Sequence, residues 1–217
     1  MVSAPCLITG GAGFLGINLV RVLLGAGWTV RSLDIAEFNY PEKTRVDAIL
    51  GDIRDVNAVS KAMNPMSVVV HCAAALPLAD RAEILSTGIE GTRLLLEAAW
   101  RSGVKRFIFI SSTAVYGVPD HVPIFEDDAL KGVGPYGQSK SEAENLCADY
   151  RARGMLVTIL RPKSFVGPER LGAFELLYDW AFDGHGFPVL GGGGEPLPTA
   201  RCRGSVSGDL VVHDGRS

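Results

Sequence analysis

The sequence predicts an α/β protein built on a doubly wound parallel sheet, and three observations support this. Short apolar runs alternate with amphipathic runs along most of the 217 residues. Some apolar runs are continuous, as in Val68, Val69 and Val70, which is typical of strands covered on both faces. No internal repeat or low-complexity linker interrupts this order before residue 190. Such regular alternation favours a parallel sheet with helices on both sides.

Hydrophobic spacing and the positions of glycine and proline predict the individual elements. Strands are expected at residues 5–8, 28–33, 46–50, 67–71, 106–110 and 155–160. Helices are expected at 14–26, in a short segment ending at 63, and at 82–101, 136–153 and 173–182, with a short extended piece at 187–190. In the first helix, residues at helical spacing are expected to form the buried face: Leu15, Leu19, Val22, Leu23 and Ala26.

The segment between the first strand and the first helix carries the main functional signal. Its glycines, Gly10, Gly13 and Gly16, have the spacing G-x-x-G-x-x-G. One glycine permits the tight turn, one lets a pyrophosphate approach the backbone, and one lets helix and strand pack closely. The helix N-terminus offers N–H groups and a partial positive charge to phosphates. The segment therefore predicts a dinucleotide site, and the simpler alternative is a purely structural turn.

Asp34 stands at the end of the second predicted strand. An acid in this position accepts hydrogen bonds from the adenosine ribose hydroxyls and repels a 2′-phosphate. Arg31 lies within the strand and not just past its end, so it is a poor candidate for binding that phosphate. These positions predict NAD rather than NADP as the cofactor. The alternative for Asp34 is a turn residue at a strand end.

Tyr136 and Lys140 are four residues apart in a predicted helix and so lie on one face. A phenol has an ordinary pKa of about 10, which a nearby ammonium and an oxidised nicotinamide are expected to lower. Tyr136 could then take a proton from a substrate hydroxyl while hydride leaves the same carbon. Ser112, after the fifth strand, could hold the same oxygen, and Lys140 could also bind the nicotinamide ribose. Alone, the pair could equally be part of a solvated helix.

Composition argues against several other classes of protein. The net charge is −3 without a basic run, so neither nucleic acid nor an anionic membrane is an expected partner. No basic leader precedes the first apolar run, and no run reaches the length of about 20 residues that spans a membrane. The expected compartment is therefore the cytoplasm. Scattered cysteines and histidines predict reduced thiols and no metal site: Cys6, Cys72, Cys147, Cys202, His71, His121, His185 and His213.

Together these residues resemble the extended short-chain dehydrogenases/reductases, specifically the NAD-dependent epimerase/dehydratase family, which has a Rossmann-type fold and acts on nucleotide sugars. The resemblance covers about residues 3–193. It rests on TGGAGFLG at 9–16, Asp34, GDIRD at 51–55, HCAA at 71–74, SSTAVYG at 111–117, YGQSK at 136–140 and LRP at 160–162.

The resemblance implies roles for particular residues. Tyr136, Lys140 and Ser112 form the implied catalytic set, and Thr113 would lie beside the substrate. Ser112 is preferred to its neighbours because it stands three residues before Val115, where the family places its catalytic Ser or Thr. Asp52 and Ile53 would contact adenine. The full set implied to bind NAD is Gly10, Gly13, Phe14, Leu15, Gly16, Asp34, Asp52, Ile53, Ala73, Ala74, Tyr136, Lys140 and Pro162.

Two departures from the family pattern bear on the reaction. Gly88 stands where the family usually has Asn near the catalytic lysine. Thr113 and Ala114 stand where its dehydratases carry Asp-Glu, so oxidation or epimerisation is favoured over dehydration. Three alternatives remain open: a 3β-hydroxysteroid-type alcohol dehydrogenase, an NAD-binding module without turnover, and an inactive truncation product. The resemblance also implies a homodimer formed through helices 82–101 and 136–153.

Residues 194–217 do not continue the family pattern. The sequence predicts an NAD-binding domain over 1–193 and an irregular, non-native tail over 194–217, with the C-terminal substrate domain largely missing. One choice of codons for residues 194–203, read in a shifted frame, gives Gly-Asn-Arg-Tyr-Gln-Leu-Leu-Asp-Val, which resembles the family's continuation. We therefore expect the tail to be a frameshifted readout of a longer gene, which sequencing of the gene would test. NAD binding with weak or absent turnover is the functional expectation.

Overall fold

The structure is a computed structural model that describes residues 5–167, 182–183 and 200–201. The chain divides into two compact units, residues 1–162 and 163–217. In the second unit, the two-residue strands β7 (Phe165–Val166) and β8 (Ala200–Arg201) pair in parallel. The proposed domain boundary at 193 and the extended piece at 187–190 lie outside the described residues, as does nearly all of the helix expected at 173–182.

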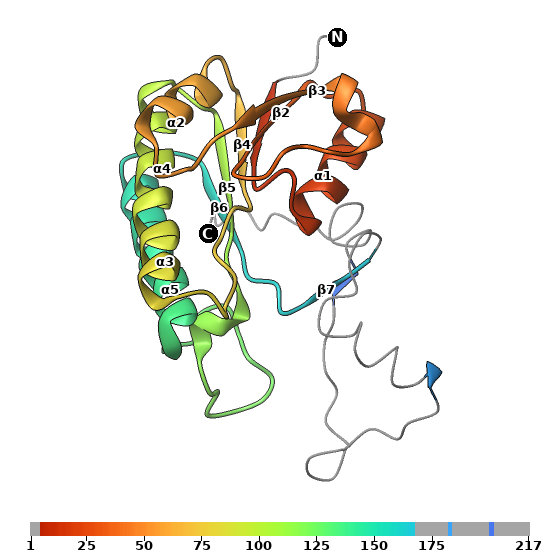
Figure 1. The fold of residues 1–217 in the computed structure, drawn as a ribbon. Helices are drawn as coiled ribbons and strands as arrows, with labels where there is room; N and C mark the ends of the chain where they lie inside the picture. The colour runs from red at the N-terminus through yellow and green to blue at the C-terminus, as the bar shows by residue number, and fades with distance from the viewer. Residues whose placement is uncertain (1–4, 168–181, 184–199, 202–217) are drawn as a thin grey trace. The chain divides into compact units, whose positions relative to one another are not determined.

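A six-stranded sheet organises the first unit (Figure 1), and its neighbouring strands pair in parallel in the order β3-β2-β1-β4-β5-β6. This confirms the predicted doubly wound sheet, and each strand lies within two residues of its predicted bounds. Thr9 pairs with both Leu33 and His71, so the carboxyl ends of the central strands share one edge. The strands are β1 (Cys6–Thr9), β2 (Val30–Asp34), β3 (Val46–Leu50), β4 (Val68–His71), β5 (Arg106–Ile110) and β6 (Val157–Leu160).

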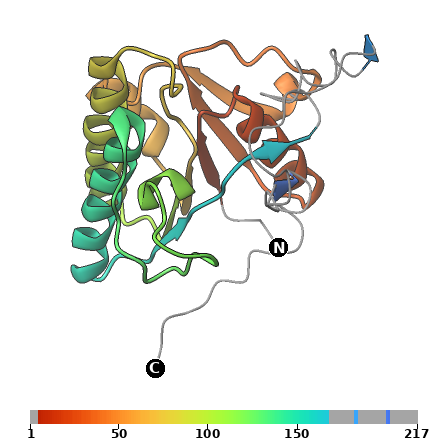
Figure 2. The same cartoon turned by 90° about the horizontal axis from the view of Figure 1, so that it is seen from below.

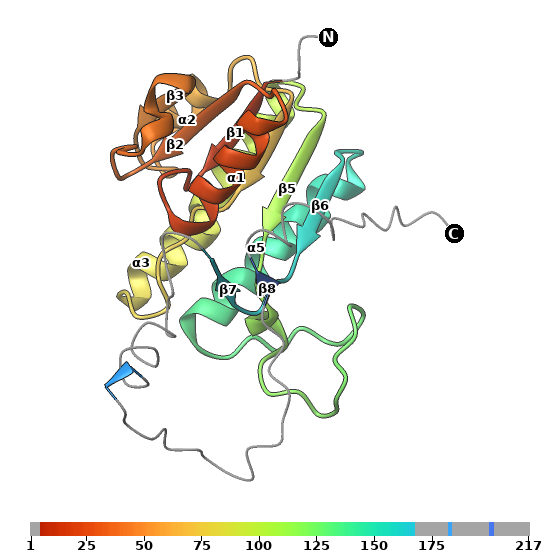
Figure 3. The same ribbon diagram turned by 90° about the vertical axis from the view of Figure 1, so that its right-hand side faces the viewer.

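Helices cover both faces of this sheet, as Figures 1 and 2 show. The helix α1 (Phe14–Gly25) lies on one face and stands in front of the sheet in Figure 3. The other face carries α2 (Val56–Met63), α4 (Thr92–Arg101) and α5 (Gly134–Ala152). Shorter helical segments are η1 (Pro41–Arg45), α3 (Arg81–Leu85), η2 (Ser86–Gly91) and η3 (Thr113–Tyr116). Among the described residues, no helix combines the length and apolarity needed to cross a bilayer.

The helix α1 is where predicted, but its predicted buried face is only partly right: Leu19 is buried and Leu15 and Leu23 are half-buried. Val22 is 37% exposed and Ala26 is exposed, whereas the buried residues are Gly16, Ile17, Asn18, Leu19, Val20 and Leu24. Gly16 explains the rotation, because a Cβ there would lie 2.0 Å from the carbonyl oxygen of Gly10. The position without a side chain must face the loop, and this turns the residues one and four positions later toward the sheet.

The helix expected at 82–101 is present as a continuous helical segment made of three parts. Its middle, η2, is a six-residue π-helical segment between α3 and α4. Short π segments inside α-helices are often found at functional sites. Beneath these helices, a buried core joins Leu7, Val69 and Phe107 of the sheet to Leu96 and Cys147 of the helices.

Candidate active site

The glycine-rich loop lies against the main chain of its neighbours. Gly10 has a φ of +70°, which favours glycine, and a Cβ there would lie 2.7 Å from the nitrogen of Ala73. A Cβ on Gly11 would lie 2.2 Å from Ser32 Oγ. Gly16 meets the carbonyl of Gly10 in the same way. The loop therefore keeps its path because these positions have no side chains.

The start of α1 is suited to an anion. Gly13 occupies the N-cap position and provides no side-chain cap, and the first turn carries no acidic residue. The N–H groups of Phe14 and Leu15, at the start of this turn, therefore keep the partial positive charge of a helix N-terminus. A pyrophosphate fits a cradle of this kind, in which glycines admit the ligand and amides bind it.

Asp34 fixes the glycine-rich loop through the main chain. Its Oδ2 accepts a hydrogen bond from the nitrogen of Ala12 at 2.9 Å, and its Oδ1 accepts one from Ala36 at 2.9 Å. The hydroxyl of Tyr40 donates to the carbonyl oxygen of Ala12 at 2.9 Å. Both main-chain polar groups of Ala12 are thus held. Tyr40 was missed in the sequence because a tyrosine in a connecting loop has no pattern that signals such a contact.

Arg31 is engaged away from the tip of β2. Its Nε lies 2.6 Å from Asp47 Oδ2, and its Nη1 donates to three carbonyl oxygens near the end of α2, those of Lys61, Ala62 and Asn64. A guanidinium bound in this way stabilises a helix C-terminus. This geometry agrees with the prediction that Arg31 does not serve a 2′-phosphate.

The structure brings Tyr136, Ser112 and Lys140 together. Ser112 lies close enough to the Tyr136 hydroxyl to oppose the rise in the pKa of that phenol. Lys140 Nζ donates to the carbonyl oxygen of Ile110 at 2.8 Å, and it lies 5.9 Å from the ring centre of Tyr136 and 4.8 Å from that of Phe109. Tyr136 and Lys140 come from α5, and Ser112 follows β5, so the sheet edge and one helix assemble the set.

Burial controls the protonation of this set. It lowers the pKa of Lys140 to about 8, although the nearby Cys72, Cys147 and Glu144 oppose the shift. It raises the pKa of Tyr136, and the nearby Ser112 hydroxyl opposes that shift only in part. The lowered phenol pKa that the sequence predicts is therefore not produced by the protein groups alone. Lys140 donates to a main-chain carbonyl, and desolvation is the largest cause of the raised pKa of the phenol.

A hydrogen-bonded chain of buried side chains runs below the site. Thr9 Oγ1 lies 2.7 Å from His71 Nδ1, and His71 Nε2 lies 3.0 Å from Thr92 Oγ1. Thr92 donates its only hydroxyl proton to the carbonyl oxygen of Gly88 at 2.6 Å, so it accepts from His71. His71 therefore carries its proton on Nε2, and Thr9 donates to Nδ1. Burial, reinforced by the charge of Lys140, lowers the pKa of His71 to about 3.

The π-helical segment packs against Ile53, after β3, and against Ser139 on α5. A Cβ on Gly91 would lie 2.4 Å from Ile53 Cδ1, and a Cβ on Gly88 would lie 2.8 Å from Ser139 Cβ. The glycine at the family's Asn position therefore packs directly on α5, beside Lys140. Ile53 is 4% exposed, so only its main chain remains available for the predicted adenine contact.

The remaining predicted residues lie along the same sheet edge. Ala73 donates to Thr9 Oγ1 at 3.4 Å, and Ala74 is exposed. The nitrogen of Thr113 donates to the carbonyl oxygen of Pro162 at 3.0 Å, which joins the ends of β5 and β6. The carboxylate of Asp52, just after β3, is bound by its neighbour Arg54. The geometry places the predicted set at one edge, and each assigned role stays a prediction.

A buried ion pair next to the candidate catalytic residues was missed in the sequence. Glu144, one turn after Lys140 on α5, is 3% exposed and accepts from Arg161 at 2.7–3.1 Å and from Ser111 Oγ at 2.5 Å. Arg161 also donates to the hydroxyl of Tyr116 at 2.6 Å. The arginine of the LRP motif thus ties β6 to α5 and to the segment after Ser112.

Neither the thiols nor the acids of the described residues form a metal site: no group of three or more His, Cys, Asp and Glu side chains gathers there. Cys6 and Cys147 are buried, and burial raises the pKa of each thiol to about 12. Both are therefore protonated and unreactive near neutral pH.

Known proteins share both sequence and fold with this chain. A 3 beta-hydroxysteroid dehydrogenase/Delta 5-->4-isomerase of Mycobacterium tuberculosis is 31% identical over 222 residues, covering 95% of this chain and 59% of that protein. A UDP-glucose 4-epimerase of Bacillus subtilis is 34% identical over 158 residues, covering 66% and 47%. The Bordetella bronchiseptica enzyme WbmG, crystallised with NAD, superposes with a TM-score of 0.75 at 30% identity, over 84% of this chain and 61% of that one.

The chain spans about half the length of the curated relatives it matches, between 47% and 59% for the two just described. Residues 6–178 match the model of one family, described as NAD dependent epimerase/dehydratase. This match covers the glycine-rich loop, the six-stranded sheet and the candidate catalytic residues Ser112, Tyr136 and Lys140. The chain therefore belongs to the NAD-dependent epimerase/dehydratase family of extended short-chain dehydrogenases/reductases.

Proposed function

We propose that the protein is an NAD-dependent oxidoreductase or epimerase that acts on a hydroxyl or keto carbon of a nucleotide sugar. The observation that carries this proposal is the grouping of Tyr136 and Ser112 beside the buried Lys140, whose Nζ lies 5.9 Å from the ring centre of Tyr136. The family description names NAD, and WbmG was crystallised with it. The UDP-glucose 4-epimerase relative supports a nucleotide sugar as the substrate class.

The glycine-rich loop and α1 would hold the cofactor's pyrophosphate through main-chain N–H groups. Asp34 would accept from the adenosine ribose, since its oxygens keep lone pairs beyond those used by Ala12 and Ala36. Lys140 donates one of its three N–H groups to the carbonyl oxygen of Ile110, and its other N–H groups would donate to the nicotinamide ribose. When bound, NAD supplies a hydride acceptor and a positive ring.

In the proposed reaction, Ser112 and Tyr136 bind the oxygen of the reacting carbon. Ser112 Oγ already accepts from the nitrogen of Ala114 at 3.1 Å, so its own proton is available to donate. Tyr136 takes the hydroxyl proton as the carbon loses hydride, and it returns that proton in the reverse direction. Because burial raises the pKa of Tyr136, this step depends on positive charge brought close to the phenol.

Calorimetric titration with NAD and NADP, beside turnover of UDP-glucose, tests the proposal. We expect NAD binding stronger than NADP binding. Tyr136→Phe should lower kcat about 10²–10⁴-fold, as the loss of a general acid–base does, while NAD binding persists. Tyr150→Phe, on the same helix and 8% exposed, is the matched control and should keep the wild-type rate. Absence of NAD binding by the wild-type chain would overturn the proposal.

A second candidate is a 3β-hydroxysteroid-type alcohol dehydrogenase. The relative from Mycobacterium tuberculosis favours it, because the match covers 95% of this chain. The same Tyr136 and Lys140 would serve an apolar secondary alcohol. Oxidation of a 3β-hydroxysteroid without oxidation or epimerisation of UDP-sugars would select this candidate. NAD binding with turnover of neither substrate would select an NAD-binding module instead.

The homodimer through helices 82–101 and 136–153 stays a prediction. In the structure these helices, α3, α4 and α5, pack against one another on one face of the sheet. Light scattering after size exclusion would give the mass in solution, and a monomer at all concentrations would contradict the dimer.

A further inference from the structure

The glycine-rich loop is built from residues with the largest main-chain freedom. Three of the four residues from 10 to 13 are glycines, and Ala12 is the exception. Glycine loses more conformational entropy on becoming ordered than any other residue does. A loop of this composition must therefore be held in place by contacts before the ligand arrives, because otherwise part of the binding free energy is lost in ordering it.

Hydrogen bonds to Ala12 hold two consecutive peptide groups of this loop. The N–H of Ala12 donates to Asp34 Oδ2 at 2.9 Å, which fixes the peptide before it. The carbonyl oxygen of Ala12 accepts from the Tyr40 hydroxyl at 2.9 Å. The N–H of the same peptide, on Gly13, donates to the carbonyl oxygen of Gly10 at 3.1 Å. Both polar groups of the peptide between Ala12 and Gly13 are therefore bound.

The orientation of this peptide matters for an anion, because it leads directly into α1. The N–H groups of Phe14 and Leu15 carry the partial positive charge of the helix start. A carbonyl oxygen carries a partial negative charge, so a carbonyl that turns toward a bound phosphate repels it. The hydroxyl of Tyr40 keeps the oxygen of Ala12 in one orientation, and its hydrogen offsets part of that charge.

The ring of Tyr40 is itself held by neighbouring side chains. It packs edge to face with the buried ring of Phe38, at 5.3 Å between ring centres. The guanidinium of Arg21 lies 5.9 Å from the centre of the Tyr40 ring, and Arg21 Nε donates to Glu42 Oε1 at 2.8 Å. Arg21 belongs to α1. The helix whose start would bind the phosphates thus also carries a residue that holds the tyrosine.

We propose that Tyr40 is a positioning residue for the pyrophosphate of the dinucleotide, and that Arg21 and Glu42 hold Tyr40 in place. The proposal rests on the proposed function, because it takes the dinucleotide to be NAD. Tyr40 acts through the main chain of Ala12 and need not touch the ligand. Since the loop binds the phosphates, the effect of Tyr40 depends on the phosphates and not on the adenosine.

Calorimetric titration of the wild-type chain and of Tyr40→Phe with NAD and with ADP-ribose tests this. Phenylalanine keeps the ring with its contacts to Phe38 and Arg21, and it lacks only the hydroxyl. The loss of one hydrogen bond should raise the Kd of both ligands about three- to tenfold. Adenosine has no phosphate, so its Kd, measured by competition with the fluorescence of bound NADH, should stay at the wild-type value.

Urea unfolding separates positioning from stability. Ala12 is half-buried, so water can bind the carbonyl oxygen that Tyr40→Phe releases, and the midpoint of unfolding should stay close to that of the wild-type chain. Tyr150→Phe is the matched control, because the ring of Tyr150 also lies beside a guanidinium, that of Arg153 at 4.7 Å, and edge to face with Trp100. This variant should bind NAD as the wild-type chain does.

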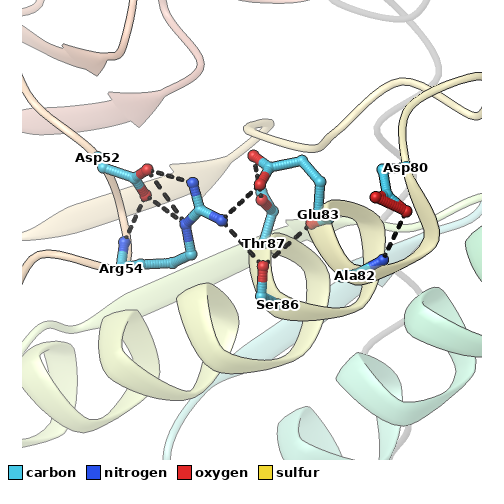
Figure 4. A network of polar contacts seen from close by, with 7 residues as sticks. All are labelled: Asp52, Arg54, Asp80, Ala82, Glu83, Ser86 and Thr87. Carbon is cyan, nitrogen blue, oxygen red and sulfur yellow. Dashed lines mark hydrogen bonds and ion pairs between the residues drawn. The ribbon is translucent and has the colours of Figure 1, made fainter.

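Variants of two glutamates test the support of the ring. Glu42→Gln removes the charge that holds Arg21, so it should raise the Kd for NAD, but by less than Tyr40→Phe does. Glu83→Gln is its control. Glu83 also binds an arginine at 2.8 Å, and that residue, Arg54, keeps its other partners in the variant (Figure 4). NAD should therefore bind to Glu83→Gln with the wild-type Kd.

Four outcomes would overturn the proposal. A wild-type Kd for NAD in Tyr40→Phe refutes the positioning role, while the proposed function stands. A Kd for adenosine that rises as much as that for NAD shows that the effect does not depend on the phosphates. A weaker Kd accompanied by a large fall in the unfolding midpoint assigns Tyr40 a structural role. A wild-type chain that does not bind NAD refutes the proposed function, and the present proposal fails with it.

Discussion

The two halves of the sheet edge are built in opposite ways. On the side of β1 and β2, the candidate site is shaped by missing side chains, because Gly10, Gly11 and Gly16 have no space for a Cβ. On the side of β4, β5 and α5, it is shaped by buried polar side chains, among them Lys140 and Glu144. We call the first the nucleotide half and the second the catalytic half, after their proposed roles. Substitutions that add atoms should therefore damage the nucleotide half, and substitutions that remove polar atoms should damage the catalytic half.

Removing one partner of the buried ion pair should have the largest effect. Glu144→Ala leaves Arg161 near the core without its carboxylate, and breaking a buried pair in this way costs about 3–5 kcal/mol. We expect the free energy of unfolding in urea to fall by that amount.

Glu90→Ala is the control for this variant. Glu90 of η2 binds Arg93 of α4 at 2.6 Å, with both side chains about half exposed, and its loss should cost less than about 1 kcal/mol. An equal fall in the free energy of unfolding for Glu144→Ala and Glu90→Ala would show that burial does not make the ion pair of Glu144 more important than an exposed one.

His71 should make the catalytic half sensitive to acid. The pKa of His71 is about 3 in the folded protein, against an ordinary 6.5, so between these values only the unfolded chain binds the proton. The stabilising contribution is present above pH 6.5 and is lost as the pH falls toward 3, by an amount on the order of a few kcal/mol.

Replacing this histidine should flatten the response to pH. His71→Asn removes the titrating group, so its free energy of unfolding should fall less steeply than that of the wild-type chain between pH 6.5 and 3. His121→Asn, at a side chain that is 53% exposed, should keep the wild-type slope. An unchanged slope in His71→Asn would assign the acid sensitivity to other groups.

The difference between the two halves of the sheet edge also explains which features could be predicted from the sequence. Glycine spacing and apolar runs are local, so the loop, the strands and the doubly wound parallel sheet followed from them. The contacts of His71, Glu144 and Arg161 join positions 17 to 62 residues apart, and no local pattern reports such pairs. The buried face of α1 was only partly right for a related reason, since the contact of Gly16 with Gly10 outweighs the spacing of the apolar residues.

Adding one methyl group should damage the nucleotide half. Gly16→Ala places a Cβ 2.0 Å from the carbonyl oxygen of Gly10, a main-chain atom that can move only with the loop. Overpacking of this kind costs about 1–3 kcal/mol, so the Kd for NAD should rise about tenfold or more. Gly25→Ala, at a site with no atom within 4 Å of the new Cβ, should bind NAD as the wild-type chain does. Similar Kd values for both variants would contradict the steric account.

Removing the hydroxyl of Ser32, below the same loop, should not lower the free energy of unfolding. This is the smallest effect that we expect, and it contrasts with the effect of removing a buried serine hydroxyl in the catalytic half. Ser32 is 1% exposed, and its Oγ finds no hydrogen-bond partner among the described residues. Since a buried unsatisfied hydroxyl is unfavourable, Ser32→Ala should raise the free energy of unfolding by up to about 1 kcal/mol and leave NAD binding unchanged.

In the catalytic half, Ser111→Ala removes a hydrogen-bond donor from Glu144 and should lower the free energy of unfolding by about 1–3 kcal/mol. Opposite signs for two buried serines would show that one half of the edge depends on shape and the other on polar contacts, whereas a loss in both would show that Ser32 has a partner in solution.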